Sequence, residues 1–318
     1  MSAATRAGTT LAALVVVAGA YALGPCAFAQ PVASEPKGAA HGGVPVGQEE
    51  VALDAQVCQT CHEDVAKEFS KSSHGRTFAA DATYSSASCT SCHTGAQEHA
   101  ATGGEKKPQS LKKGGAEANA SCLSCHAGNP KQAHWSGSAH QLAGATCASC
   151  HDVHKMHIGT PEQQKTLPGA TASTKKCLEC HGELRASLHQ RSSHPMRDGQ
   201  MECVSCHNPH GTSGEKLIEQ GSVNELCYSC HQNLRGPFLW EHSPVRQDCL
   251  TCHRPHGSNY PQMLQARVTQ LCQSCHQQGR HQTVPGVPAS IWVGNKACLN
   301  CHQNIHGSNH PSGPLFQR

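Results

Sequence analysis

The stretch CASCHDVH, residues 147–154, places two histidines three positions apart, directly after a pair of cysteines. His151 completes a C-x-x-C-H motif, whereas His154 lies outside it. The same arrangement returns as CVSCHNPH (203–210) and CLTCHRPH (249–256). Recurrence of this kind predicts that one small structural unit is repeated along the chain.

The C-x-x-C-H motif occurs ten times in the 318 residues and contains 20 of the 21 cysteines, all except Cys26. The ten motifs are Cys58-Cys61-His62, Cys89-Cys92-His93, Cys122-Cys125-His126, Cys147-Cys150-His151, Cys177-Cys180-His181, Cys203-Cys206-His207, Cys227-Cys230-His231, Cys249-Cys252-His253, Cys272-Cys275-His276 and Cys298-Cys301-His302.

This motif is the attachment signature of c-type haem, in which two thiols bond to the macrocycle and the histidine becomes an axial iron ligand. A single copy would also fit a redox-active dithiol, half of a zinc site or a disulfide loop. Ten copies, each with its histidine, instead predict ten covalently bound c-type haems along this chain.

The composition agrees with that prediction. Aromatic residues make up 4% of the chain, hydrophobic residues 37%, and the mean hydropathy is −0.49. So little apolar side chain cannot build an ordinary core, and we expect the macrocycles to supply it and the chain to fold only with haem attached. The formal net charge of +3 gives no indication of nucleic-acid binding, because haem propionates would outweigh it.

The first 29 residues have the features of a signal peptide. Arg6 is followed by the apolar run LAALVVVAGAYAL (11–23) and by AFA (27–29), which predicts cleavage after Ala29. A lipid anchor on Cys26 is the alternative, but Pro25 departs from the usual lipobox. Residues 30–57, rich in proline, glycine and alanine, are predicted to be a flexible leader, and 58–318 the haem-binding domain. No later segment has the length and apolarity to span a bilayer.

Fifteen histidines lie outside the motifs, more than enough to give each iron a second axial imidazole. With the motifs taken in pairs, the first motif is usually followed by a histidine 11 to 14 residues on, and the second by one three to six residues on. The predicted distal ligands are His74, His99, His140, His154, His194, His210, His242, His256, His281 and His306. His134 is the alternative to His140, and His41, His157, His189 and His310 are predicted to be spare.

The reach of the chain decides which iron His154 can serve. Three residues span at most about 10 Å, whereas histidines on opposite faces of one iron have Cα atoms ~12 Å apart. His154 is therefore predicted to serve a neighbouring haem rather than that of His151, and the same holds for His210 and His256. The methionines follow no matching repeat, so methionine ligation is not expected.

The predicted fold is that of a multihaem cytochrome c, mostly irregular coil with short α-helices and little or no β structure. Helices are expected at 63–73, 177–190 and 215–220. Two imidazoles on every iron leave no open position for a substrate, and no C-x-x-C-K variant is present, so electron transfer is favoured over catalysis.

With ten such motifs and the segments SSH (72–74, 192–194), NPHG (208–211) and RPHGS (254–258), residues 50–310 resemble the periplasmic decahaem cytochromes of the MtrA/MtoA/PioA/DmsE family. The resemblance implies an extended rod of two similar five-haem halves, about 58–195 and 196–318. It also implies insertion into a porin-like β-barrel of the outer membrane, with periplasmic and extracellular cytochromes as further partners. Such a conduit links the periplasm to extracellular donors or acceptors, in Fe(II) oxidation or in metal or sulfoxide reduction. A free periplasmic shuttle to a soluble reductase is the alternative.

Overall fold

The computed structural model describes residues 55–81, 89–155, 169–277, 297–311 and 313–317. Every described residue belongs to the unit formed by residues 51–318. The predicted signal peptide and most of the leader lie outside the described residues. So do three of the histidines named above, His41, His157 and His281.

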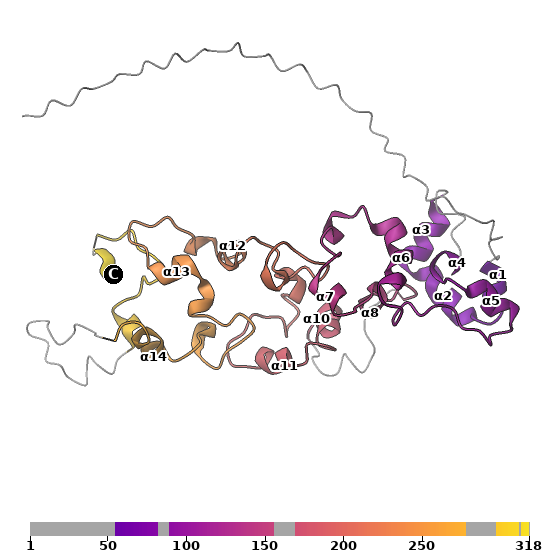
Figure 1. Ribbon diagram of the computed structural model, residues 1–318. Helices are drawn as coiled ribbons and strands as arrows, with labels where there is room; N and C mark the ends of the chain where they lie inside the picture. Colours follow the sequence, from indigo (N-terminus) through magenta and orange to yellow (C-terminus); the bar gives the residue numbers. More distant parts are fainter. Residues whose placement is uncertain (1–54, 82–88, 156–168, 278–296, 312, 318) are drawn as a thin grey trace, which may run out of the picture. The chain divides into compact units, whose positions relative to one another are not determined.

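Short helices joined by irregular segments make up the described structure (Figure 1). The α-helices are α1 (Ala55–Gln59), α2 (Glu63–Lys71), α3 (Ser73–Ala80), α4 (Cys89–Cys92), α5 (Ala96–Ala101), α6 (Gly115–His126), α7 (Ala139–Leu142), α8 (Cys147–Cys150), α10 (Ala172–Cys177), α11 (Glu183–Leu188), α12 (Val223–Tyr228), α13 (Ser243–Gln247) and α14 (Val268–Gln273). The 3₁₀ helices are η2 (Pro130–Gln132), η3 (Cys203–Ser205), η4 (Glu215–Leu217), η5 (Gln232–Leu234), η6 (Cys249–Thr251), η7 (Pro261–Met263), η9 (Cys298–Asn300) and η10 (Gly313–Leu315). The longest of all these helices, α6, has 12 residues, so none of them would be stable alone in water.

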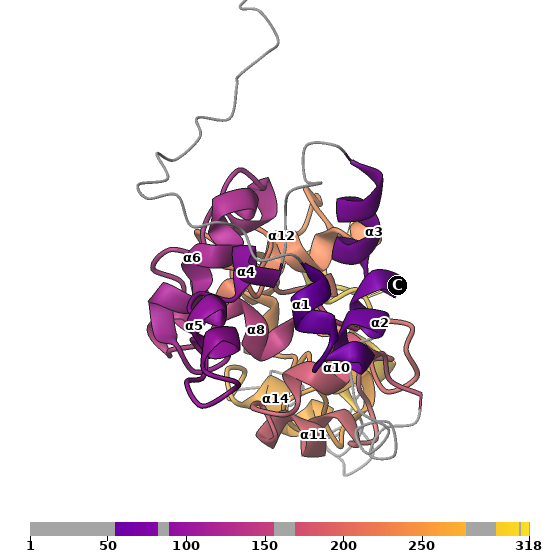
Figure 2. The same ribbon diagram turned by 90° about the vertical axis from the view of Figure 1, so that its right-hand side faces the viewer.

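Pairing between extended segments is confined to isolated bridges in the described part of the chain. The four bridges are Ser192–Ser258, His207–Ile218, Trp240–Ser308 and His253–Leu264. Neither Figure 1 nor the turned view in Figure 2 contains a sheet. The prediction of coil with short helices and little β structure is confirmed.

The helices predicted at particular ranges agree with the structure only in part. The stretch 63–73 holds α2 and the start of α3, which are separated by Ser72, whose side chain caps α3 by accepting from the Gly75 amide. A continuous helix over 177–190 is wrong, because α10 ends at Cys177 and α11 begins at Glu183. At 215–220 only the 3₁₀ turn η4 forms, with Lys216 in the left-handed region at φ 53°.

Few hydrophobic side chains are buried. The described ones are Ala118, Trp135, Ala170, Leu178, Leu188, Met196 and Leu264, and four of these (Ala170, Leu178, Leu188 and Met196) form one cluster around α10 and α11. Met196 packs in this apolar cluster. A core this small agrees with the expectation that side chains alone do not hold the chain together.

Close backbone contacts at two glycines join segments far apart in sequence. A Cβ on Gly211 would lie 2.1 Å from the His134 carbonyl oxygen, and one on Gly257 would lie 2.0 Å from that of Ser187. Both glycines also have a positive φ, 114° and 142°. Only glycine permits such an approach, so each residue after a C-x-x-C-H-x-P-H segment is a docking point for an earlier part of the chain.

Replacement of Gly257 by alanine should weaken this docking. We expect Gly257→Ala to lower the free energy of unfolding of the haem-loaded protein by about 2–3 kcal/mol, because a Cβ meets both a backbone clash and an unfavourable φ. Gly221→Ala is the control, since nothing lies within 4 Å of a Cβ there. Denaturant titration followed in the Soret band measures both, and equal stability of the two variants would contradict the prediction.

Candidate haem sites

Nine of the ten motif histidines have the ring of a non-motif histidine opposite their own, with ring centroids 5.8 to 6.4 Å apart. The pairs are His62–His99, His93–His154, His126–His74, His151–His210, His181–His140, His207–His256, His231–His194, His253–His306 and His276–His242.

This separation is what one shared metal ion requires. A metal–imidazole nitrogen bond is about 2 Å long, and each nitrogen lies about 1.1 Å from the centre of its ring. Two such bonds in line therefore separate the ring centroids by ~6 Å. Rings in direct van der Waals stacking would lie closer together. The donor sets therefore fit an iron held between each pair of histidines, with a macrocycle attached through the adjacent cysteines.

The pairs follow a regular register along the chain. His154 faces His93 of the second motif with an interplanar angle of 4°, and His151 faces His210. Each even-numbered motif up to the eighth is thus paired with the histidine that follows the motif two places later. Each odd-numbered motif from the third to the ninth is paired with the histidine that follows the motif two places earlier. Among the nine, the first motif is the exception: His62 faces His99, the histidine that follows the adjacent second motif.

His134 and His140 have different surroundings in the structure. The His140 ring lies 6.1 Å from that of His181, and its Nδ1 donates to the Pro209 carbonyl at 2.8 Å. The backbone of His134 lies against Gly211 instead. None of the nine paired motif histidines has His134 as its partner.

The tenth motif histidine, His302, is described without its predicted partner. Its Nδ1 donates to the Leu315 carbonyl at 2.6 Å. His281, which the sequence predicts as the remaining distal ligand, lies outside the described residues.

Backbone carbonyls orient several of these imidazoles. The Nδ1 atoms of His140 and His194 donate to Pro209 and Pro255, each at 2.8 Å. A hydrogen bond from Nδ1 leaves Nε2 unprotonated and aimed at the metal.

Two motif histidines are oriented by left-handed turns. His207 and His253 donate through Nδ1 to Lys216 and Gln262, each at 2.8 Å. Lys216 and Gln262 have φ values of 53° and 52°, and the left-handed Lys216 explains why no α-helix forms at 215–220. These acceptors were not predicted from the sequence, although both lie nine residues after their histidine.

Burial keeps many of the paired imidazoles neutral. It lowers the pKa of His93, and the neighbouring His154 and His62 lower it further. The same cause lowers the pKa of His74, His151, His210, His242, His256 and His306. Neutral imidazole is the form that binds a metal ion.

The cysteines of successive motifs meet in two alternating ways. First cysteines are neighbours within each pair of motifs: Cys58 and Cys89, Cys122 and Cys147, Cys177 and Cys203, Cys227 and Cys249, and Cys272 and Cys298. Between pairs the second cysteines are neighbours: Cys92 with Cys125, Cys150 with Cys180, Cys206 with Cys230 and Cys252 with Cys275. Burial raises the pKa of the Cys122 thiol to about 11, and Cys147 adds to the shift.

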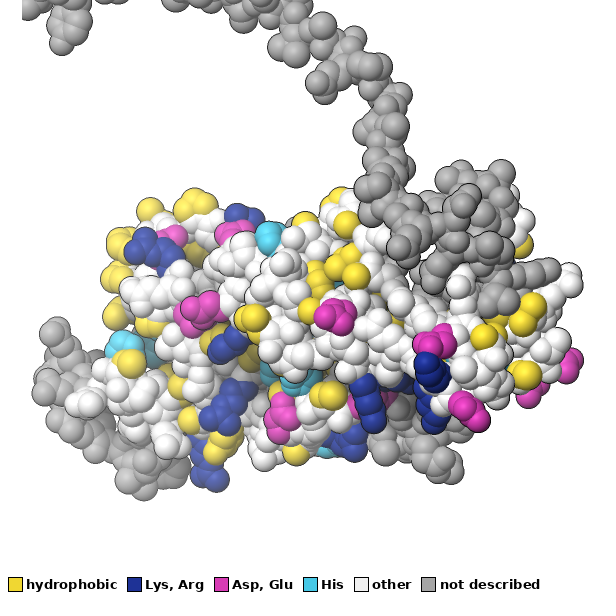
Figure 3. Space-filling model, turned by 45° about the vertical axis from the view of Figure 1, so that its right-hand side comes forward, with side chains coloured by type: hydrophobic (Ala, Val, Ile, Leu, Met, Phe, Trp, Pro, Cys, Tyr) yellow, Lys and Arg dark blue, Asp and Glu magenta, His cyan; other side chains and the backbone are white. Residues whose placement is uncertain are grey.

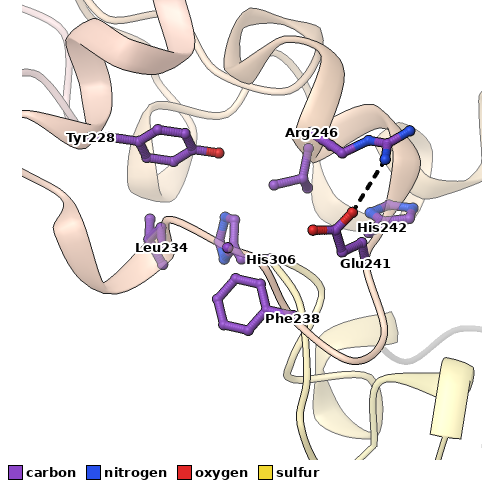
Figure 4. A pocket seen from close by; sticks show the side chains of 9 residues that line it. Tyr228, Leu234, Phe238, Glu241, His242, Arg246 and His306 are labelled. Carbon is purple, nitrogen blue, oxygen red and sulfur yellow. Dashed lines mark hydrogen bonds and ion pairs between the residues drawn. The ribbon is translucent and has the colours of Figure 1, made fainter.

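A single cavity of about 4200 Å³ runs past these groups, lined by cysteines of the second to the tenth motif. Ordinary ligand pockets have volumes of about 300–1,000 Å³, so this space suits several large cofactors. A separate cavity of about 40 Å³ lies beside His242 and His306, the partners of the ninth and eighth motifs (Figure 4). Glu241 and Arg246 form an ion pair at its edge at 3.4 Å.

Comparisons with known proteins agree with this chemistry. The model of the family described as "Doubled CXXCH motif" matches residues 194–236 and 242–281. The motifs, their paired histidines and the shared cavity define a multihaem c-type cytochrome.

The chain is 38% identical over 280 residues to "Multiheme cytochrome MtrA" of Shewanella baltica (strain OS185), an alignment that covers 83% of this chain and 81% of that protein. The chain belongs to the MtrA family of multihaem cytochromes, and it is an electron carrier.

Among solved structures, the undecahaem cytochrome from the S-layer of Carboxydothermus ferrireducens is 22% identical. The match covers 73% of this chain and 32% of that one, with a TM-score of 0.14, so it carries no structural argument. Within the described ranges, no helix has both the length and the apolarity needed to cross a membrane.

Removal of a single distal histidine should open one iron. We expect His140→Ala to yield one ferrous haem per chain that binds CO, because the partner of His181 is lost. His134→Ala, six positions away, is the matched control and should bind none. CO difference spectra of the reduced proteins measure the stoichiometry, and the opposite result would reassign the ligand.

The partner of His154 can be tested by deletion of a haem. In the otherwise native chain, His154→Ala should open one iron, that of the His93 haem. In a chain where Cys89→Ala and Cys92→Ala have already removed that haem, His154→Ala should open no further iron. If His154 served the haem of His151, CO titration would count the extra open iron in both backgrounds.

Proposed function

We propose that this electron carrier is a conduit across the outer membrane, which works inside a porin-like β-barrel protein. The observation that supports the proposal best is the succession of imidazole pairs without a break from the first motif to the ninth. Haem bound at each pair supplies an iron that alternates between the ferric and the ferrous state. A series of such sites is suited to moving electrons over a long distance.

Ten haems and ten histidine pairs are part of this proposal. The nine described pairs do not include His302. Its proposed partner is His281, the histidine that follows the ninth motif, and the two form the tenth pair. This assignment makes the two ends of the series alike, because the first motif also takes the histidine of its neighbour, His99. The register of the other pairs supports it.

The chain's own residues hold, orient and protect the irons in this proposal. The cysteines attach each macrocycle, and the paired histidines fill both axial positions. Carbonyls such as those of Pro209 and Pro255 keep the distal imidazoles in place through Nδ1. An iron with two imidazoles has no position left for nitrite, sulfite or peroxide, and we therefore propose electron transfer without catalysis.

The surface of the chain and its family support the proposal of a barrel partner. On the face in Figure 3, Lys and Arg side chains are interspersed with Asp and Glu, a surface that lipid tails would not solvate. A barrel with a polar lumen would shield it across a hydrocarbon layer of about 30 Å. The proposed location is the periplasm, at the outer membrane, after removal of the signal peptide.

The proposed rod consists of two five-haem halves, about 58–195 and 196–318. Contacts across this boundary would join them, since His194 Nδ1 donates to Pro255 and Ser192 bridges to Ser258. Periplasmic cytochromes at one end, and extracellular cytochromes, Fe(II), metal oxides or sulfoxides at the other, are the proposed partners.

Sealed proteoliposomes test the conduit. With the cytochrome and its barrel protein reconstituted together, we expect an external reductant to reduce an electron acceptor trapped inside, because electrons pass through the paired sites. Vesicles with the barrel alone are the control and should show no reduction.

The alternative, a free periplasmic shuttle, predicts a different result. The cytochrome would then be released without detergent, would not co-purify with a barrel protein, and would reduce a soluble reductase directly. That combination would contradict the conduit.

A further inference from the structure

A buried asparagine lies at the junction between the third and fourth motifs. Asn119 is in α6, three residues before Cys122, and is 2% exposed. Its Oδ1 accepts a hydrogen bond of 2.8 Å from the backbone amide of Cys147, the first residue of α8. The first amides of a helix have no partner within it, so this side chain completes α8 from a neighbouring motif.

The same arrangement returns between the seventh and eighth motifs. Asn224 is in α12, three residues before Cys227, and its Oδ1 accepts from the Cys249 amide at 2.8 Å. Its Nδ2 also donates to the carbonyls of Val245 and Arg246, each at 3.0 Å. One side chain thus joins the end of α13 to the start of η6, which carries the next motif.

The fifth and sixth motifs have a threonine at the equivalent position. Thr174 is three residues before Cys177, is 0% exposed, and is a neighbour of the Cys203 thiol. In all three cases the side chain lies beside the first cysteine of the next motif, and the two first cysteines are neighbours. The thiols at these junctions would attach adjacent macrocycles.

We propose that Asn119 and Asn224 are positioning residues that set the separation of the two haems within the motif pairs three–four and seven–eight. The inference rests on the proposed function, because it concerns haems that the motifs bind. A bond from the asparagine to the amide of the partner cysteine fixes two attachment points at once. Electron transfer slows steeply as haem edges move apart, so a small shift here would limit the whole series.

Asn119→Leu is the sharpest variant, because leucine matches asparagine in size but cannot accept a hydrogen bond. Asn119→Asp retains the acceptor, and the Asn119 Nδ2 that it replaces has no hydrogen-bond partner among the described residues. Asn233→Leu, at an exposed position close to the seventh motif, is the control for the substitution itself.

Soret circular dichroism reports the coupling of closely spaced haems, and protein-film voltammetry reports their interaction in the intact holoprotein. We expect Asn119→Leu to lose one component of the Soret couplet and to slow electron transfer through the chain. Asn119→Asp and Asn233→Leu should keep both signals. A purely structural role would lower the melting temperature of Asn119→Leu and leave the couplet unchanged, and that result would overturn the proposal.

Asn224→Leu, with Asn233→Leu again as its control, provides a second test at the other junction, and it decides the question if Asn119→Leu does not fold with all its haems. EPR of the native protein tests the proposed function separately from the asparagine variants. If its haems are not bis-histidine by EPR, the proposed function fails, whatever the asparagine variants do.

Discussion

The structure depends on one distance, the gap of about 6 Å between two imidazole rings that face each other. This separation is too wide for direct stacking, and it equals two metal–nitrogen bonds in line plus the distance from each nitrogen to its ring centre. In each of the nine described pairs, a motif histidine contributes one ring and a histidine from elsewhere in the chain the other. These histidine pairs, rather than a large hydrophobic core, bring distant segments of the chain together.

Most of these pairs join a motif to the histidine that follows a motif two places away, and they therefore connect distant parts of the chain. Even-numbered motifs up to the eighth are paired with a histidine further along the chain and odd-numbered ones from the third to the ninth with a histidine further back, so each inner two-motif unit is tied to both its neighbours. Hydrogen bonds such as that of His140 to Pro209, and the close approach of Gly257 to Ser187, follow the same connections. Because eight of the nine described pairs join different two-motif units, we expect folding and cofactor attachment to depend on each other.

Contacts beyond the paired histidines form two kinds of junction. In the first, a carbonyl outside the motifs, such as that of Pro209 or Pro255, accepts from a distal imidazole. In the second, Asn119 or Asn224 accepts from the amide of the next motif's first cysteine. The first kind orients a ligand and the second sets the spacing of two attachment points. An electron carrier needs both, since ligand orientation influences the potential of an iron and spacing determines the rate of transfer.

The class of protein and the scarcity of regular structure in the described residues could be predicted from the sequence, because C-x-x-C-H carries its chemistry within five residues and the composition leaves no material for an ordinary core. Chain reach also predicted that His154 serves another haem than that of His151, and the repeat favoured His140 over His134. The ring that His154 faces, that of His93, and the carbonyl acceptors at Lys216 and Gln262 came only from the tertiary structure. These depend on where distant backbone segments lie, and a local pattern of residues contains no information about a partner some sixty positions away.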